Sequence, residues 1–216
     1  MRKVICAAHP ASSEADIDAV LDVDQEVWGH IFPGDRSMMQ SRCRTFPDCG
    51  LVLAMHDGTC VGFLSAQRVF RDDIVCAPDK RWAALTDDGT IRTTHKPEGD
   101  WLYGVGLAVT PQGGSCGASS VLIDYVARYA MAKSVRGAML AARVPGYSRR
   151  AVDMSIYDYV VAKRRESPID PELKIYARFG LMVGSPPIII TEYMGAGADP
   201  DSGDYGVVVE WSNPML

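Results

Sequence analysis

The sequence predicts an α/β fold, with a central mixed β-sheet that carries helices on both faces. Three observations lead to this prediction. Apolar runs rich in β-branched and aromatic residues alternate along the chain with stretches whose apolar residues recur at helical spacing. The apolar run at 101–109 passes through a Gly/Ser-rich turn directly into such a helical pattern. No repeat, low-complexity segment or linker divides the 216 residues, so we expect one domain over 1–216.

The first third of the chain is predicted to form a strand, two helices and a hairpin. The strand is expected over residues 2–8. Ser12 or Ser13 can cap the first helix, which carries acidic residues in its first turn, where the helix dipole favours them. Two apolar runs joined by Asp57-Gly58 are typical of a hairpin. The helices are expected at 14–28 and 36–44, and the hairpin strands at 51–55 and 60–69.

Residues 71–100 are polar and rich in turn-forming residues. An insert of this length within a compact domain is usually functional or mobile. We therefore expect it to flank a binding site and not to build the core.

The centre of the chain holds the strand at 101–109, which Pro111 ends because proline has no N–H for a ladder. Small residues follow at 113–120, where a ligand could approach the backbone closely. The next helix has its apolar residues at Val121, Leu122, Tyr125, Val126 and Tyr129. Free N–H groups in its first turn could bind a phosphate, although such turns also occur where nothing binds.

The last third is predicted to hold two helices and three strands. The first of these helices is expected around residues 154–161, with Ser148 or Asp153 near its start. Asp170-Pro171 opens the other, over 172–179, and Gly180 closes it. The strands are expected at 137–144, 188–193 and 205–211. The predicted order is therefore β-α-α-β-β-insert-β-α-β-α-α-β-β.

Composition narrows the function. The formal net charge of −5 disfavours a nucleic-acid-binding surface, which depends on clustered Lys and Arg. No apolar run approaches the length of a membrane span, and no signal peptide is recognisable, so we expect a cytoplasmic protein with no membrane partner. The six Cys and four His lack metal-ligand spacing, so neither a metal site nor a disulfide framework is indicated.

Several segments resemble the GNAT acyltransferase superfamily, whose members bind acyl-CoA. The run 107–111 (LAVTP) is similar to the strand that leads into the superfamily's pyrophosphate loop, and 176–181 (YARFGL) is similar to its Tyr-x-x-x-Gly-Phe signature. Phe46-Pro47, the hairpin and 65–69 look like a subset that loads starter acyl groups in polyketide assembly. Other patches, among them 143–147 and 209–214, resemble GNAT domains fused to carbon–nitrogen hydrolases. The resemblance covers nearly the whole chain.

This resemblance implies a GNAT-like fold and an acyl-CoA co-substrate, with acetyl-CoA expected. The loop departs from the superfamily pattern Arg/Gln-x-x-Gly-x-Gly/Ala: counted from Pro111 it lacks the basic or amide residue, and counted from Gln112 it lacks the first glycine. The polyketide subset carries a decarboxylating His where this chain has Tyr176. The residues expected to bind the cofactor are Leu107, Ala108, Val109, Gly114, Ser115, Cys116, Gly117, Ala118 and Ser119.

Acyl transfer from a thioester needs a polarised carbonyl, a deprotonated nucleophile and a proton for the leaving thiolate. Backbone N–H groups around residues 107–109 could polarise the carbonyl. The resemblance implies that Tyr176 protonates the sulfur, whereas spacing alone favours a core aromatic residue. Glu192, on a predicted late strand, is the candidate general base, with Asp153 and Glu172 as alternatives.

Three functions follow from these features. The leading one is an enzyme that transfers an acyl group from acyl-CoA to a small-molecule amine. The second is S-acyl transfer to an acyl carrier protein, for which Arg143, Arg149, Arg150 and 163–165 could supply a basic rim. The third is a non-catalytic binding module with a degenerate loop. A homodimer is compatible with the resemblance.

Overall fold

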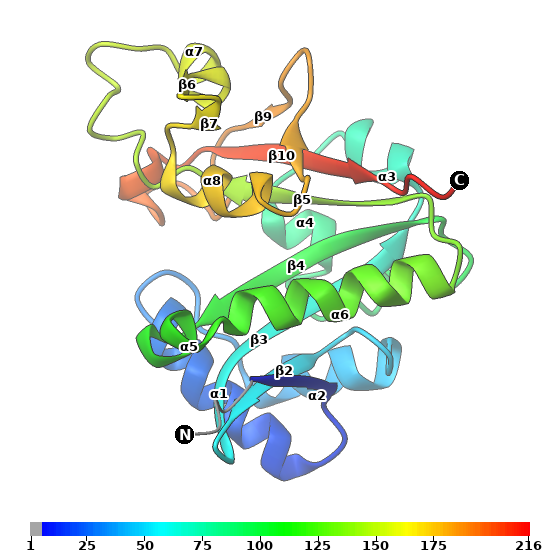
Figure 1. Cartoon of the computed structure of the whole chain (residues 1–216). Coiled ribbons are helices and arrows are strands. Elements are labelled where there is room, and N and C mark those ends of the chain that lie inside the picture. The colour runs from blue at the N-terminus through cyan, green and yellow to red at the C-terminus, as the bar shows by residue number, and fades with distance from the viewer. Residues whose placement is uncertain (1–5) are drawn as a thin grey trace.

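The computed structural model describes residues 6–216, and a mixed sheet with helices on both faces confirms the predicted fold class (Figure 1). The main sheet has eight strands in the order β1-β2-β3-β4-β5-β10-β8, with β9 also paired to β10. Its strands are β1 (Ala7–Pro10), β2 (Val52–His56), β3 (Thr59–Val69), β4 (Trp101–Val109), β5 (Gly137–Arg143), β8 (Met182–Val183), β9 (Ile189–Ile190) and β10 (Gly206–Ser212). β6 (Lys163–Arg164) and β7 (Ser167–Pro168) form a separate hairpin.

The helices are α1 (Glu14–Trp28), α2 (Arg36–Thr45), α3 (Arg71–Val75), α4 (Trp82–Thr86), α5 (Pro111–Cys116), α6 (Ala118–Ala132), α7 (Ile156–Val161) and α8 (Pro171–Ala177), with a 3-10 turn at Pro200–Ser202. α1 has the predicted bounds because Ser13 and Asp16 form a capping box at its start. Asp57 and Gly58 both have positive φ in the β2–β3 turn, as a tight hairpin requires.

Alternate side chains of β3 divide the core between the two faces of the sheet. Phe63 packs against α1 and α2 in a cluster with Leu51, Leu53 and Ala108. Leu64 points to the other face, in the cluster that holds Leu122 of α6. Figure 1 shows α6 and α8 crossing the sheet on the viewer's side.

The elements differ from the predicted ones in several places. Part of the strand predicted at 2–8 lies outside the described residues, and β1 ends two residues later. The Gly/Ser-rich loop contains a short helix, α5, because Thr110 caps it and Pro111 occupies its first turn. The strand predicted at 188–193 reduces to β9, and β8, β6 and β7 were not predicted. Those strands are too short to produce a sequence pattern.

The segment 71–100 contributes to the core as well as to a pocket wall. It forms α3 and α4, and four of its apolar side chains are buried in the main cluster: Ile74, Trp82, Leu85 and Ile91. The expectation that this insert stays out of the core is therefore wrong, because its large apolar side chains turn inward.

No helix in the part of the chain that the structure describes is long and apolar enough to cross a lipid bilayer.

Candidate active site

Strands β4 and β5 separate halfway along their length. They pair in parallel only where residues Trp101–Gly104 of β4 lie beside residues Gly137–Leu140 of β5. A bulge accompanies the separation, since Ser65 of β3 pairs with Gly106 and the next residue, Ala66, pairs with Gly104, which leaves Val105 unpaired. Beyond this point, no strand among residues 6–216 pairs with the side of β4 that faces away from β3.

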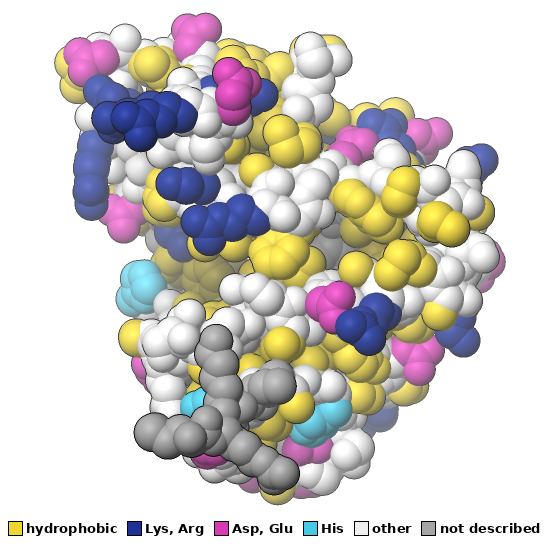
Figure 2. All heavy atoms as spheres, in the orientation of Figure 1, with side chains coloured by type: hydrophobic (Ala, Val, Ile, Leu, Met, Phe, Trp, Pro, Cys, Tyr) yellow, Lys and Arg dark blue, Asp and Glu magenta, His cyan; other side chains and the backbone are white. Residues whose placement is uncertain are grey.

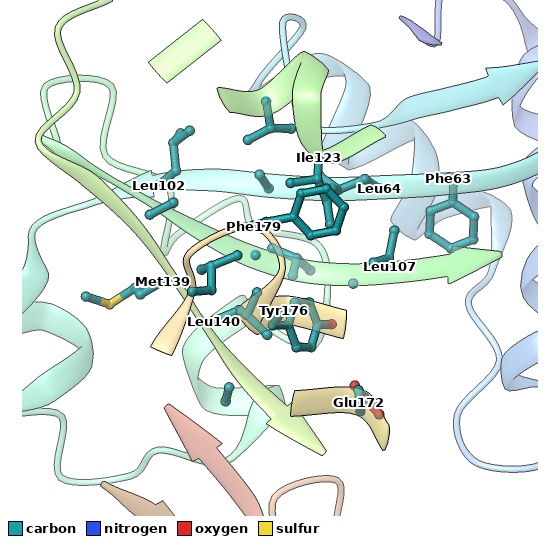
Figure 3. Close-up of a pocket in the computed structure, with 18 of the residues that line it drawn as sticks. Phe63, Leu64, Leu102, Leu107, Ile123, Met139, Leu140, Glu172, Tyr176 and Phe179 are labelled. Carbon is teal, nitrogen blue, oxygen red and sulfur yellow. The ribbon is translucent and has the colours of Figure 1, made fainter. Parts of the chain in front are cut away.

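A cavity of about 610 Å³ opens between the separated strands. Neighbouring residues of one strand line it together: Phe63 and Leu64 of β3, and Met139 and Leu140 of β5. Because successive strand side chains point to opposite faces, the cavity passes through the sheet. α6 and α8 border it on one face, and α1, α2 and α4 on the other. Figure 3 shows several of these lining residues.

Helix α8 presents two polar side chains to this largely apolar cavity. Glu172 and Tyr176 lie four residues apart, on one face of the helix, and both line the cavity (Figure 3). The buried Asp170 fixes the start of α8. Its carboxylate accepts hydrogen bonds from Glu172 N at 2.8 Å, from Leu173 N at 3.1 Å and from the Tyr159 hydroxyl at 3.0 Å.

Burial changes the proton affinity of both groups. Desolvation raises the pKa of Glu172 to about 8, against the opposing charge of Arg143. Desolvation, followed by the charge of Glu172, raises the pKa of Tyr176 well above its usual value. The site therefore holds a carboxyl group that titrates near neutral pH beside a phenol that stays protonated.

Arg143, at the end of β5, is held inside the site. Its Nε and Nη2 atoms donate to Asp199 at 2.6 and 2.5 Å, and its guanidinium lies 5.2 Å from the ring centroid of Trp28. The expectation that Arg143 belongs to an exposed basic rim is therefore not met, because Asp199 neutralises it.

The three carboxylates that the sequence suggests as general base lie in different parts of the structure. Glu192 is exposed in a turn with φ 51°, outside the residues that line the cavity. Asp153 is also exposed in a turn. Of the three, only Glu172 reaches the cavity. The four-residue spacing of Glu172 and Tyr176 could have shown that they share a helix face.

The predicted cofactor-binding residues divide into two groups. Leu107 lines the cavity, whereas Ala108 packs toward α1 and α2 and Val109 packs in the main core. The remaining residues, at 114–119, lie outside the cavity lining, in α5, at Gly117 and in the first turn of α6.

The junction of α5 and α6 still leaves donors free. Thr110 accepts from Gly113 N and Gly114 N, so those amides are used within α5. The N–H groups of Ala118 and Ser119 lie in the first turn of α6, where a helix leaves its N–H groups without a partner inside the helix. A Cβ built on Gly114 or Gly117 would meet nothing within 4 Å, so the backbone there faces open space.

Cys116 lies in this junction, with its Sγ 3.7 Å from Sγ of Cys6. Burial, followed by the interaction with Cys116, raises the pKa of Cys6 to about 11. Both thiols are free. Among residues 6–216, no group of three His, Cys, Asp or Glu is arranged to hold a metal ion.

Comparison with known proteins gives a consistent picture, although no family model matches the chain. An "uncharacterized N-acetyltransferase YkwB" of Bacillus subtilis (strain 168) is 29% identical over 206 residues, which cover 93% of this chain and 86% of that protein. A "probable hydrolase YhcX" of the same organism is also 29% identical, over 93% of this chain but 37% of its own length.

Two solved structures share the fold over nearly the full chain. The GphF GNAT-like decarboxylase in complex with isobutyryl-CoA superposes with a TM-score of 0.77 at 25% identity, covering 95% of this chain and 98% of that one. The loading GNATL domain of CurA from Lyngbya majuscula gives a TM-score of 0.79 at 15% identity, covering 96% and 97%.

Proposed function

Since the chain belongs to the GNAT superfamily of acyltransferases, we propose that it transfers an acyl group from an acyl-CoA to the amine of a small-molecule acceptor. One observation carries the proposal. Glu172 and Tyr176 face an apolar cavity at the point where β4 loses its pairing with β5. A base, an acid and unpaired backbone groups are thereby available around one reacting centre.

The acyl-CoA substrate fits the separated strands. Its amide-bearing arm can pair with the free edge of β4, as an added strand would. The Ala118 and Ser119 amides can donate hydrogen bonds to a phosphate oxygen at the positive end of the α6 dipole. The Gly114 and Gly117 backbone is open to the same ligand. These features support the predicted cofactor residues at 114–119.

In the transfer, Glu172 removes a proton from the acceptor amine. A conjugate acid with a pKa of about 8 suits a base that works near neutral pH. The amine nitrogen attacks the thioester carbonyl, and backbone N–H groups of β4, around Leu107, stabilise the oxyanion. When the C–S bond breaks, Tyr176 donates its proton to the departing sulfur. Glu172 thus replaces Glu192 as the proposed general base.

The test combines acyl-CoA binding with turnover. We expect saturable stabilisation of the protein by acetyl-CoA in a thermal-shift titration, because a ligand that binds only the folded state raises its apparent stability. Release of free CoA thiol in the presence of a panel of amines then reports transfer. No stabilisation by any acyl-CoA contradicts the proposal, and stabilisation without transfer to any amine or thiol indicates a binding module.

A basic surface favours a second candidate, S-acyl transfer to an acyl carrier protein. Figure 2 shows Lys and Arg side chains gathered at the upper left, above a hollow with hydrophobic walls. Exposed cations of the α7–α8 region carry no ion pair among residues 6–216, although the chain is acidic overall. They are Arg149, Arg150, Lys163, Arg164, Arg165, Lys174 and Arg178. Such a surface suits an acidic protein partner.

An acyl carrier protein bearing its phosphopantetheine thiol discriminates between the two candidates. Mass spectrometry detects acyl transfer to that thiol, and the same protein without the prosthetic group is the control. If the carrier is the acceptor, the double variant R164E/R165E slows transfer to it and leaves transfer to small amines unchanged. If R164E/R165E matches wild type in its rate of transfer to the carrier protein as well as to small amines, the result counts against a carrier partner.

A further inference from the structure

Arg42 of α2 places an unpaired positive charge in the wall of the cavity. Its side chain is buried, with 3% of the residue exposed, and it lines the cavity on the face bordered by α1, α2 and α4. Its Nε donates to the Gly89 carbonyl at 2.7 Å. The contacts of its terminal nitrogens are thioether sulfurs, Met38 Sδ at 3.1 Å from Nη2 and Met39 Sδ at 3.5 Å from Nη1.

Thioether sulfurs are weak acceptors, and an arginine has five N–H donors. None of the ion pairs formed by residues 6–216 involves Arg42. A buried charge in a protein is normally paired with a carboxylate or with a ligand. The terminal nitrogens of Arg42 therefore have donor capacity that the chain itself does not use.

Asp24 of α1 is a neighbouring carboxylate, but it is engaged elsewhere. It is 5% exposed, lines the same cavity, and accepts a 2.6 Å hydrogen bond from Gly34 N through Oδ2. Its charge only partly offsets the burial of Arg42, since desolvation lowers the pKa of Arg42 to about 10. The guanidinium remains protonated at neutral pH and attracts an anion from the cavity.

The walls around this charge are aromatic. Trp28 of α1 and Trp82 of α4 line the cavity, as does Phe32, whose ring makes an edge-on contact with Trp82 at 5.0 Å between centroids. The pocket thus offers apolar surface for the body of a ligand, and in Arg42 a cation without an ion-pair partner for its end. Glu172 and Tyr176 line the same cavity from α8, so one molecule can reach both the reacting centre and Arg42.

We propose that Arg42 binds a carboxylate of the molecule that occupies this end of the cavity. The inference rests on the proposed acyl transfer and narrows its substrates to those with an apolar body and a carboxylate. The planar guanidinium can bind both carboxylate oxygens at once. The carboxylate comes either from the amine acceptor, as in an amino acid, or from the far end of a dicarboxylic acyl group, and the experiment separates these sources.

The kinetic experiment uses matched pairs of substrates. For the acceptor, amino acids with α-, β- and γ-amino groups are compared with the corresponding amines that lack the carboxylate, at saturating acetyl-CoA. For the donor, succinyl-CoA is compared with butyryl-CoA. We expect kcat/KM to be at least tenfold higher for the carboxylate member of one pair, and the pair that shows this preference identifies the source.

The variant R42M tests whether Arg42 causes the preference. Methionine keeps an apolar stem of similar length and removes the charge. The ratio of kcat/KM for the carboxylate member to kcat/KM for the neutral member should therefore fall to about one, while activity on the neutral member remains. R42K keeps the charge without the planar fork and should retain part of the preference. It also tests the role of Arg42 if R42M folds poorly. R44M, on an exposed neighbour in α2, is the matched control and should behave as wild type.

A binding measurement keeps the inference separate from catalysis. 3-Phenylpropionate and 3-phenylpropanol share an aromatic body and differ in the carboxylate. We expect thermal stabilisation of wild type by the acid alone, and none of R42M. If acetyl-CoA stabilises the protein but no substrate or ligand pair shows a preference for the carboxylate member, the inference is wrong. Arg42 then only stabilises the turn at Gly89, through its hydrogen bond to the Gly89 carbonyl. If no acyl-CoA binds, the acyl-transfer proposal fails, and the acid–alcohol comparison still decides the role of Arg42.

Discussion

The indole nitrogen of Trp82 donates a 2.8 Å hydrogen bond to the carbonyl oxygen of Val105. Val105 is the bulged residue of β4, the point beyond which β4 and β5 no longer pair. Trp82 comes from the segment between β3 and β4, and its ring lines the cavity. A residue of the polar insert thus satisfies a backbone group that the bulge leaves unpaired.

Replacing Trp82 by Phe should destabilise the fold by about 1–3 kcal/mol, because the buried Val105 carbonyl loses its partner. The free energy of unfolding from urea titration measures this change. W28F is the matched control, since Trp28 also lines the cavity but its indole nitrogen makes no hydrogen bond among the described residues. Equal losses in the two variants would show that aromatic area, and not the hydrogen bond, matters.

Glu172→Gln should lower kcat/KM by roughly 10²-fold or more, the usual contribution of a general base. For wild type, kcat/KM should rise with pH through about 8, where Glu172 loses its proton. The variant should lack this rise. E192Q, which changes an exposed glutamate outside the cavity, should keep both the rate and the profile. An unchanged pH profile in E172Q would exclude Glu172 as the base.

The same pKa predicts how stability depends on pH. Between about 4.5 and about 8, folded Glu172 holds its proton while the unfolded group has lost it. The folded state therefore binds more protons, and its stability contribution from Glu172 falls as pH rises through this window. Urea denaturation at pH 5 and at pH 8.5 should show that the free energy of unfolding falls more between these two pH values for wild type than for E172Q. A larger loss in E172Q would contradict the raised pKa.

Tyr176→Phe should lower kcat at least tenfold without weakening acetyl-CoA binding in the thermal-shift titration. The phenol acts only when the sulfur departs, and its removal leaves the ring in place. Because the pKa of Tyr176 is raised well above its usual value, its protonation should not limit the rate at alkaline pH up to about 9. Y157F, on the exposed face of α7, is the control and should leave kcat unchanged.

Gly117→Ala should destabilise the protein by about 1–2 kcal/mol and weaken acetyl-CoA binding. Gly117 has φ 82°, which an L-residue with a Cβ disfavours, although the Cβ would meet no neighbour. Gly114→Ala is the matched control: its site is equally open and its φ is not positive, so stability should change little. A large loss of stability in Gly114→Ala, with none in Gly117→Ala, would show that the backbone of α5, and not the α5–α6 junction, is sensitive to a side chain.

Much of the fold could be predicted from local signals. α1 begins and ends where its caps and apolar spacing indicated, and Asp57-Gly58 forms the expected turn. The strand at 101–109 has the bounds that its apolar run gave. Each of these signals acts over a few residues, through capping, turn conformation or side-chain period, and so is legible in the sequence.

The candidate site depends on contacts between residues far apart in the chain. Glu172, Tyr176, Trp82 and Arg42 come from three helices, and no sequence pattern shows that they line one cavity. Glu192 alternates with apolar residues as a strand residue would, yet the chain turns there because β9 already reaches Gly206, the first residue of β10, and the ladder has no further partner. The sequence by itself determined the longer elements and the resemblance to the superfamily. The tertiary structure decided which carboxylate faces the cavity and which cation is left without a partner, because burial and pairing depend on how the elements pack.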